Sequence, residues 1–253
     1  MGENMFRLDG EVALVTGSSR GLGAAMALAL AEAGADVVLH DRCAAGETER
    51  AIREKTNVRT ISLVADLMDR AAAIGLVDQA IAAMGKLDIL VNNAGIIRRA
   101  PAAEHPDLDW DEVMEINLTA VFRLCRAAGA RMLERHHGKI VNIASLLSFQ
   151  GGILVPSYAA AKGGVMQLTK ALANEWAGSG VNVNAIAPGY MRTENTRPLQ
   201  EDPVRNKAIT DRIPAGRWGE PSDLAGPVVF LASKASDYLN GHVLVVDGGW
   251  MGR

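Results

Sequence analysis

The stretch VALVTGSSRGLG, residues 12–23, decides the fold. Its first five residues form a short apolar run rich in valine, which is typical of a strand buried on both faces. Glycines follow at positions 17, 21 and 23, where the strand gives way to a helical pattern. Without Cβ atoms the backbone can turn tightly and approach a ligand, and the start of a helix favours negative charge. The stretch therefore predicts a phosphate-binding turn. Because the spacing is G-x-x-x-G-x-G, a glycine-rich turn without a ligand is the alternative.

The same order of a short apolar run and then a helical pattern continues along the chain, which predicts a parallel sheet with right-handed crossovers. We find no internal repeat and no linker, so residues 1–253 are expected to form one domain. The expected strands are Val12–Thr16, Val37–His40, Thr60–Ala65, Ile89–Asn92, Lys139–Ala144, Val181–Ala187 and Val243–Val246. The expected helices are Gly21–Ala33, Asp69–Met84, Leu108–Arg135, Ser157–Ala177 and Ser222–Ala232.

Residues 188–218 interrupt this alternation with a long, polar stretch that begins with a proline. Long excursions of this kind are often lids over a substrate site. We therefore expect the 188–218 segment to be a lid, and an ordinary surface insertion is the alternative.

Composition excludes several classes of protein. The 26 Lys and Arg residues against 29 Asp and Glu residues give a net charge of −3, and aromatic residues make up 4%. A nucleic-acid binder would usually show a basic face and stacking aromatics, so nucleic acid is not an expected partner. The chain lacks a run of about 18 apolar residues, so no membrane partner is expected.

Other features point to a reducing compartment and to chemistry without a metal. Residues 1–10 lack the apolar core of a secretory signal, and Cys43 and Cys125 cannot form a disulfide framework. A cytoplasmic protein is therefore expected. No metal site is expected, since the histidines have no ligand spacing with cysteine or carboxylate. These histidines are His40, His105, His136, His137 and His242.

An acidic residue at the end of the second expected strand bears on the choice of cofactor. Asp41 lies 18 positions beyond Gly23, close to the place where a carboxylate reads the ribose 2′-hydroxyl of a dinucleotide. A carboxylate there repels a 2′-phosphate, which favours NAD over NADP. Arg20 and Arg42 argue for NADP, because either could pair with that phosphate. We expect NAD.

Two polar residues interrupt the apolar stripes of the expected helices. Asn117 lies within one stripe, and Lys162 lies within another, four residues after Tyr158 and on the same helix face. A tyrosine has a pKa of about 10, and a neighbouring ammonium would lower that pKa until the phenol can exchange protons near neutrality. Ser145 follows the expected strand 139–144, at the sheet edge where ligands bind. The alternative for Lys162 is a lysine whose stem packs while its head reaches water.

These motifs together resemble the short-chain dehydrogenase/reductase superfamily over essentially the whole chain. The residues that carry the resemblance are Thr16-Gly17-x-x-x-Gly21-x-Gly23, Asn92-Asn93-Ala94-Gly95, Asn117, Ser145, Tyr158-x-x-x-Lys162 and Pro188-Gly189. The resemblance implies a single-domain Rossmann fold whose seven-stranded parallel sheet has the order 3-2-1-4-5-6-7, with helices on both faces. It also implies a homotetramer.

The resemblance implies a role for each matching residue. Tyr158 would be the general acid/base, Lys162 would hold the nicotinamide ribose, Ser145 would orient the substrate, and Asn117 would hold a water in a proton relay. Asp66 would contact adenine, and Thr193 the nicotinamide carboxamide. The expected cofactor contacts are Gly17, Ser19, Arg20, Gly21, Leu22, Gly23, Asp41, Asp66, Leu67, Asn92, Asn93, Ala94, Gly95, Tyr158, Lys162, Pro188, Gly189 and Thr193.

A narrower resemblance concerns the substrate. The blocks NNAGIIRR (92–99), SLLSFQGGILVPSY (145–158), APGYMRT (187–193) and IPAGRWG (213–219) look like a family of sugar-acid dehydrogenases in uronate breakdown. Those enzymes use NAD to interconvert 2-keto-3-deoxygluconate and its 2,5-diketo form by hydride transfer at C5. Gluconate 5-dehydrogenases share much of this frame.

A small acid with several hydroxyls needs a cation and polar partners. Arg98 is expected to bind the carboxylate, with Arg99, Arg192 and Arg197 as alternatives, and Gln150 is expected to contact a hydroxyl. Ser145 and Tyr158 would contact the reacting oxygen. A reductase of carrier-linked acyl chains and a non-catalytic cofactor-binding sensor are the other functions that remain open.

Overall fold

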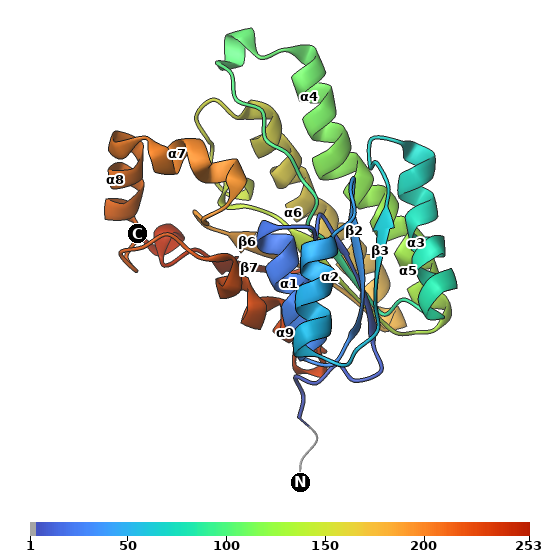
Figure 1. The fold of residues 1–253 in the computed structure, drawn as a ribbon. Helices are drawn as coiled ribbons and strands as arrows, with labels where there is room; N and C mark the ends of the chain where they lie inside the picture. Colours follow the sequence, from blue (N-terminus) through green and yellow to red (C-terminus); the bar gives the residue numbers. More distant parts are fainter. Residues whose placement is uncertain (1–3) are drawn as a thin grey trace.

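The computed structural model describes residues 4–253, so the first three residues of the amino-terminal segment considered above lie outside it. Its centre is a seven-stranded parallel sheet in the order β3-β2-β1-β4-β5-β6-β7 (Figure 1), which confirms the expected fold. The strands are β1 (Val12–Thr16), β2 (Asp36–Asp41), β3 (Thr60–Val64), β4 (Ile89–Asn92), β5 (Gly138–Ile143), β6 (Val181–Pro188) and β7 (Val243–Val246).

Helices cover both faces of this sheet (Figure 1). Helices α1, α2 and α9 pack on one face, and α3, α5 and α6 pack on the other. The helices are α1 (Gly21–Glu32), α2 (Gly46–Lys55), α3 (Arg70–Met84), α4 (Asp107–Met114), α5 (Ala120–Glu134), α6 (Pro156–Trp176), α7 (Arg197–Glu201), α8 (Pro203–Arg212) and α9 (Ala225–Ala232). Within residues 4–253, no helix has the length and apolar character to span a membrane.

The near-continuous apolar runs of the strands arise because both faces of the sheet are buried. Along β1, Val12 and Leu14 point into the core beneath α3, α5 and α6, whereas Ala13 and Val15 point into the core beneath α1, α2 and α9. Since successive side chains of a strand face opposite sides, a strand between two helical layers needs an apolar residue at every position.

The expected strand limits agree with the structure to within one residue, but three helical features were not expected. Helix α2 was missed because its ten residues are mostly polar and only Thr48 and Ile52 are buried. The expected helix 108–135 is α4 and α5 joined by a π-helical turn, Glu115–Thr119. The 188–218 segment contains α7 and α8, which were not predicted.

The 188–218 segment rests on a third, smaller apolar cluster. Its buried members are Leu146, Ile209, Ile213, Trp218 and Trp250. Leu146 follows Ser145, so the cluster joins the end of β5 to helix α8 and to the carboxyl-terminal residues. Helices α7 and α8 stand beyond the end of the sheet that carries β6 and β7 (Figure 1).

Candidate active site

The turn after β1 is held against the loop after β4. The side-chain amide of Asn93 donates to the carbonyls of Thr16 (2.9 Å) and Gly17 (3.0 Å). Gly17 has a φ of +63°, and a Cβ there would lie 2.9 Å from Cα of Ala94. A Cβ on Gly23 would lie 2.1 Å from the Gly17 carbonyl oxygen. Only glycine therefore fits at these two positions.

The start of α1 suits an anion. Its N-cap residue, Arg20, makes no side-chain capping bond, and the first turn carries no acidic residue. The first backbone N–H groups of a helix have no partner within the helix, so here they can bind a phosphate. The tight turn and the uncapped helix together fit the pyrophosphate of a dinucleotide.

A cleft of about 660 Å³ opens at the carboxyl ends of the strands and passes the start of α1. It connects the end of β2 with α6 and with the 188–218 segment. The expected cofactor residues that line it are Gly17, Arg20, Gly21, Leu22, Gly23, Asp41, Asp66, Leu67, Asn93, Ala94, Gly95, Tyr158, Lys162 and Thr193. It is also lined by residues that the sequence analysis did not select, namely His40, Ile96, Ile116, Ile143, Glu194, Asn195 and Gln200.

Four expected cofactor residues do not line this cleft. Ser19 instead hydrogen-bonds the Asp41 carboxylate through its hydroxyl and, at 3.3 Å, through its backbone N–H. Pro188 is the buried last residue of β6, and Gly189 packs so close to the turn after β7 that a Cβ would lie 2.6 Å from Cα of Asp247. Asn92 does not line the cleft either.

Asn92 points into the protein core. Its Nδ2 donates to Asn142 Oδ1 at 2.8 Å and to Cys125 Sγ at 3.2 Å. Asn142 in turn donates to Thr169 of α6 at 3.0 Å. Because side chains alternate along a strand and its extension, the adjacent Asn93 faces the cleft while Asn92 faces the helices. Burial also raises the pKa of the Cys125 thiol to about 12, whereas Cys43 is exposed.

Asn117 lies in the π-helical turn, and its side chain is fully buried. Its Oδ1 accepts from the N–H of Ile96 at 2.8 Å, and its Nδ2 donates to the carbonyl of Ile96 at 2.8 Å. The side-chain amide therefore fixes the loop after β4 through two bonds. Both ends of the amide are used by the protein, so the side chain serves first to position the wall of the cleft.

Tyr158 and Lys162 lie together on α6 at the inner end of the cleft. Lys162 is 4% exposed, and its Nζ donates to the carbonyl of Ile143 at 2.6 Å. The same Nζ lies over the Tyr158 ring, 5.7 Å from its centroid. Burial lowers the pKa of the Lys162 ammonium to about 8.

The pKa of Tyr158 departs from expectation. Burial raises the pKa of its hydroxyl above the ordinary value, and a hydrogen bond with Ser145 and the positive charge of Arg99 act in the opposite direction. The Nζ of Lys162 is directed at the Ile143 carbonyl and lies over the Tyr158 ring. Arg99 is the cation whose positive charge lowers the pKa of the Tyr158 hydroxyl.

The four candidate arginines differ in their partners. Arg98 pairs with Glu112 of α4 at 2.6 Å, Arg192 pairs with Glu220 at 3.0 Å, and Arg197 pairs with Glu194. Arg99 pairs with no carboxylate among residues 4–253. Its guanidinium donates to the carbonyl of Asn195 in the 188–218 segment at 2.9 Å. Burial lowers the pKa of Arg99, which the adjacent Tyr158 opposes.

At the amino ends of the strands, three groups come close together although the sequence showed no ligand spacing. Single ligand atoms of Glu11, Asp88 and His137 lie within 4.8 Å of one another. The Asp88 carboxylate already pairs with Lys86 and Arg135, both at 2.8 Å, and Glu11 pairs with His137 at 3.0 Å. These ion pairs account for the cluster.

We expect the free energy of unfolding to depend on pH through Lys162. The folded protein loses this proton near pH 8, whereas an unfolded lysine keeps it to about pH 10.4. Between these values the unfolded state binds more protons, so raising the pH favours the folded state. From pH 7 to pH 9.5 the wild type should gain about 2 kcal/mol relative to Lys162→Met. Urea unfolding of both proteins at both pH values measures this gain, and an equal change in the two proteins would contradict it.

Known proteins resemble this chain along nearly its whole length. Residues 17–251 match the family described as enoyl-(acyl carrier protein) reductase. The chain is 54% identical over 253 residues to the 2-dehydro-3-deoxy-D-gluconate 5-dehydrogenase of Dickeya dadantii, with 99% of each chain covered. It is 51% identical over 249 residues to the protein of the same name from Bacillus subtilis, with 98% of this chain and 97% of that one covered.

A solved structure supports the same assignment. The gluconate 5-dehydrogenase from Burkholderia cenocepacia, in complex with NADP and tartrate, superposes with a TM-score of 0.92 at 42% identity, and 98% of each chain is covered. The glycine turn and the Tyr158–Lys162 pair line the cleft at the strand ends, and Ser145 hydrogen-bonds Tyr158. The chain belongs to the short-chain dehydrogenase/reductase family.

Proposed function

We propose that this chain is an NAD-dependent oxidoreductase that interconverts 2-dehydro-3-deoxy-D-gluconate and its 2,5-diketo form by hydride transfer at C5. The observation that carries the substrate class is the position of Arg99, which has no carboxylate partner among residues 4–253 and whose positive charge acts on the hydroxyl of Tyr158. The relatives from Dickeya dadantii and Bacillus subtilis, which bear the name of this activity, support the proposal.

Three groups of residues in the cleft would each bind a different part of the cofactor. The glycine turn and the start of α1 would hold the pyrophosphate, Asp41 the adenosine ribose, and Lys162 the nicotinamide ribose. When bound, the nicotinamide accepts or supplies a hydride, and its oxidised form adds positive charge beside Tyr158. Lys162 is supplied by helix α6, whereas the other groups lie at the end of β2 and between the end of β1 and the start of α1.

The protein's own chemistry is the movement of one proton. In oxidation, ionised Tyr158 takes the proton from the C5 hydroxyl, while Ser145 hydrogen-bonds the same oxygen. In reduction, protonated Tyr158 gives its proton to the oxygen as negative charge develops there, and Ser145 stabilises that charge. Since burial raises the pKa of Tyr158 in the protein alone, positive charge from Arg99 and the bound cofactor is needed to favour the ionised form.

Arg99 would place the substrate. Its guanidinium can bind a carboxylate through two parallel hydrogen bonds, and it would hold the acid so that C5 lies at Tyr158. Because Arg99 also donates to the Asn195 carbonyl, we propose that the 188–218 segment acts as a lid that is fixed by the same residue. Arg98 is less suited to this role, since Glu112 and Asp109 already share its charge.

The choice of NAD rests on Asp41, whose carboxylate accepts from Ser19 and from the N–H of Arg42 at 2.8 Å. Arg20 and Arg42 also line the cleft, and the Burkholderia cenocepacia structure contains NADP, so NADP is the alternative. We further propose a homotetramer in the cytoplasm. Trp110 and Phe122, which are 39% and 40% exposed on α4 and α5, support an assembly through these helices.

A carrier-linked acyl reductase is the second candidate, because the description of the matching family names that activity. It would prefer NADPH and a basic docking patch, whereas Asp41 disfavours NADPH and the chain carries a net charge of −3. A non-catalytic sensor is the third candidate, and the intact arrangement of Ser145, Tyr158 and Lys162 argues against it.

Initial rates at the absorbance band of the reduced nicotinamide test the activity. We expect rapid turnover of 2-keto-3-deoxygluconate with NAD, slower turnover of D-gluconate, and none of a carrier-linked enoyl thioester with NADPH. Tyr158→Phe should abolish turnover while keeping cofactor binding, because it lacks the hydroxyl that exchanges the proton. Full activity of Tyr158→Phe would refute the mechanism, and cofactor binding without turnover of any substrate would favour the sensor.

Exchange of the charge at Asp41 tests the cofactor proposal. Asp41→Ser removes the carboxylate that would repel a 2′-phosphate and leaves Arg20 and Arg42 in place. The ratio of kcat/KM for NADP to that for NAD should rise at least about tenfold, the loss of one charge-assisted contact being equivalent to about 1.5–3 kcal/mol. If the wild type already prefers NADP, the arginines outweigh Asp41 and the proposal of NAD is wrong.

Replacement of each adjacent arginine tests the carboxylate site. Arg99→Ala should raise the KM for the sugar acid about 10- to 100-fold, because the carboxylate loses a charge-assisted pair. Arg98→Ala, the matched control, should change KM by less than about twofold. A neutral ketone without the carboxylate should show no difference between Arg99→Ala and the wild type. The reverse ranking of the two variants would assign the role to Arg98.

A further inference from the structure

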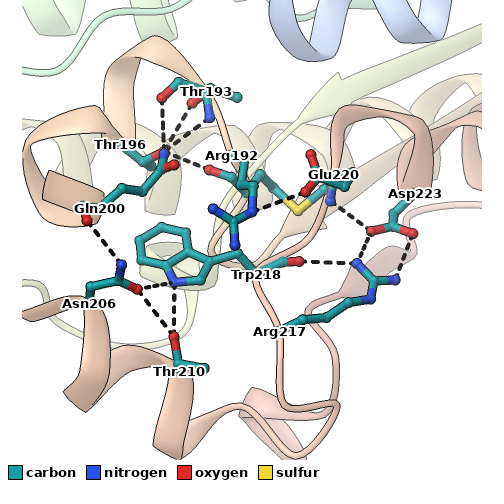
Figure 2. Close-up of polar contacts among 11 residues, drawn as sticks. Arg192, Thr193, Thr196, Gln200, Asn206, Thr210, Arg217, Trp218, Glu220 and Asp223 are labelled. Carbon is teal, nitrogen blue, oxygen red and sulfur yellow. Dashed lines mark hydrogen bonds and ion pairs between the residues drawn. The ribbon is translucent and has the colours of Figure 1, made fainter. Parts of the chain in front are cut away.

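A continuous chain of hydrogen bonds crosses the 188–218 segment (Figure 2). It begins at the buried indole of Trp218, passes through Asn206 of α8 and Gln200 of α7, and reaches Thr196 and Thr193 at the cleft. Thr193 and Gln200 line the cleft, whereas Trp218 and Asn206 do not. The chain therefore links the base of the segment with the residues that face the cofactor.

Asn206 lies at the centre of this hydrogen-bond chain, and its side-chain amide accepts from one neighbour and donates to the other. Its Oδ1 accepts from the indole N–H of Trp218 at 2.9 Å, and its Nδ2 donates to the backbone carbonyl of Gln200 at 2.9 Å (Figure 2). An indole can only donate and a backbone carbonyl can only accept. An amide satisfies both partners in one orientation, and a carboxylate of the same shape can satisfy only Trp218.

From Gln200 the chain continues into the turn that carries Thr193. The side-chain Nε2 of Gln200 donates to Thr196 Oγ1 at 2.8 Å and to the carbonyl of Thr193 at 3.3 Å. Thr196 Oγ1 donates to the carbonyl of Met191 at 2.6 Å and accepts from the N–H of Thr193 at 3.1 Å. The backbone of Thr193 is thus held on both sides by groups that Gln200 positions.

The other end of the chain is anchored in the body of the protein. Trp218 is 1% exposed and lies in the apolar cluster with Leu146, next to Ser145. Its ring meets Tyr190 edge to face at a centroid distance of 5.5 Å. The next residue, Gly219, exchanges backbone hydrogen bonds with Tyr190 (2.9 Å) and Arg192 (2.8 Å). Trp218 is therefore held in a fixed position relative to Ser145 at the end of β5.

We propose that Asn206 is a positioning residue for the nicotinamide half of the cofactor. It couples α7, α8 and the Thr193 turn to Trp218. The 188–218 segment therefore closes on the cofactor as a single unit whose position relative to Ser145 is fixed. The adenosine half, which lies toward Asp41 and Asp66, is outside the reach of this chain. Asn206 touches neither cofactor nor substrate and acts through Gln200 and Thr196.

The test compares the binding of a whole cofactor with that of its adenosine part. Asn206→Asp keeps the acceptor for Trp218 but sets a carboxylate oxygen against the Gln200 carbonyl. We expect the Kd for NAD to rise at least about tenfold, as the loss of a half-buried donor to a backbone carbonyl implies, while the Kd for AMP stays within about twofold of wild type. Isothermal titration calorimetry with NAD and with AMP measures both, and kcat/KM should fall with the NAD affinity.

Two further variants on the same network complete the design. Thr210→Val removes a hydroxyl that contacts Asn206 Oδ1 at 3.3 Å and the indole N–H at 3.1 Å but lies off the path to Gln200, and it should leave both affinities unchanged. Trp218→Phe removes the indole donor and keeps an aromatic ring, so it should weaken NAD binding and spare AMP binding. This variant decides the matter should Asn206→Asp fail to fold, as judged by its circular dichroism.

Equal losses of NAD and AMP affinity in Asn206→Asp and Trp218→Phe would show general destabilisation and overturn the proposal, as would wild-type affinities in both. The inference rests on the dinucleotide site of the proposed function and does not require a particular sugar acid. Failure of the substrate assay with an intact NAD-specific effect would therefore refute the proposed substrate alone.

Discussion

The contact between the loop after β4 and the turn after β1 is the constraint on which the site depends. The Asn93 amide binds the carbonyls of Thr16 and Gly17, and the two backbones lie so close that no Cβ fits at Gly17. This closeness brings the phosphate-binding turn and the catalytic side of the sheet into one cleft. Asn117 then fixes the far end of the same loop through Ile96. The loop after β4 is thereby held at both ends by side-chain amides that bind backbone groups.

Burial disfavours the charged forms of three ionisable groups at the site. Lys162 and Arg99 are both held in surroundings that lower their pKa values, and Tyr158 is held where its neutral form is favoured. At neutral pH, Lys162 therefore lies nearer to its change of protonation state than it would in water, whereas Tyr158 lies farther from it. An anionic substrate and an oxidised cofactor would bring compensating charges to the same few residues. Binding of the substrate and of the cofactor would therefore each offset part of the unfavourable burial of charge.

The strand limits could be predicted to within one residue, because a sheet buried on both faces leaves continuous apolar runs between glycine, asparagine and proline residues. The strand order was implied by the resemblance to the short-chain dehydrogenase/reductase superfamily and not by these runs. The glycine turn and Tyr158 with Lys162 could also be placed, since strand ends and a four-residue helical spacing fix their neighbourhood. Helix α2 could not, because it buries too few apolar residues to show a period. The opposite directions of Asn92 and Asn93, and the different partners of Arg98 and Arg99, depend on contacts with α4, α5 and the 188–218 segment that lie far away in the sequence.

The two cysteines lie in opposite surroundings, and this difference has a practical use. The thiol of Cys125 is buried between Asn92 and Asn142 with a pKa of about 12, whereas Cys43 is exposed two residues beyond Asp41. Since the thiolate is the reactive form, a maleimide dye would attach at Cys43 and leave Cys125 unmodified. The chain thus carries a single reactive labelling position near the end of the cleft that Asp41 lines, where a fluorophore can report occupancy without an engineered cysteine.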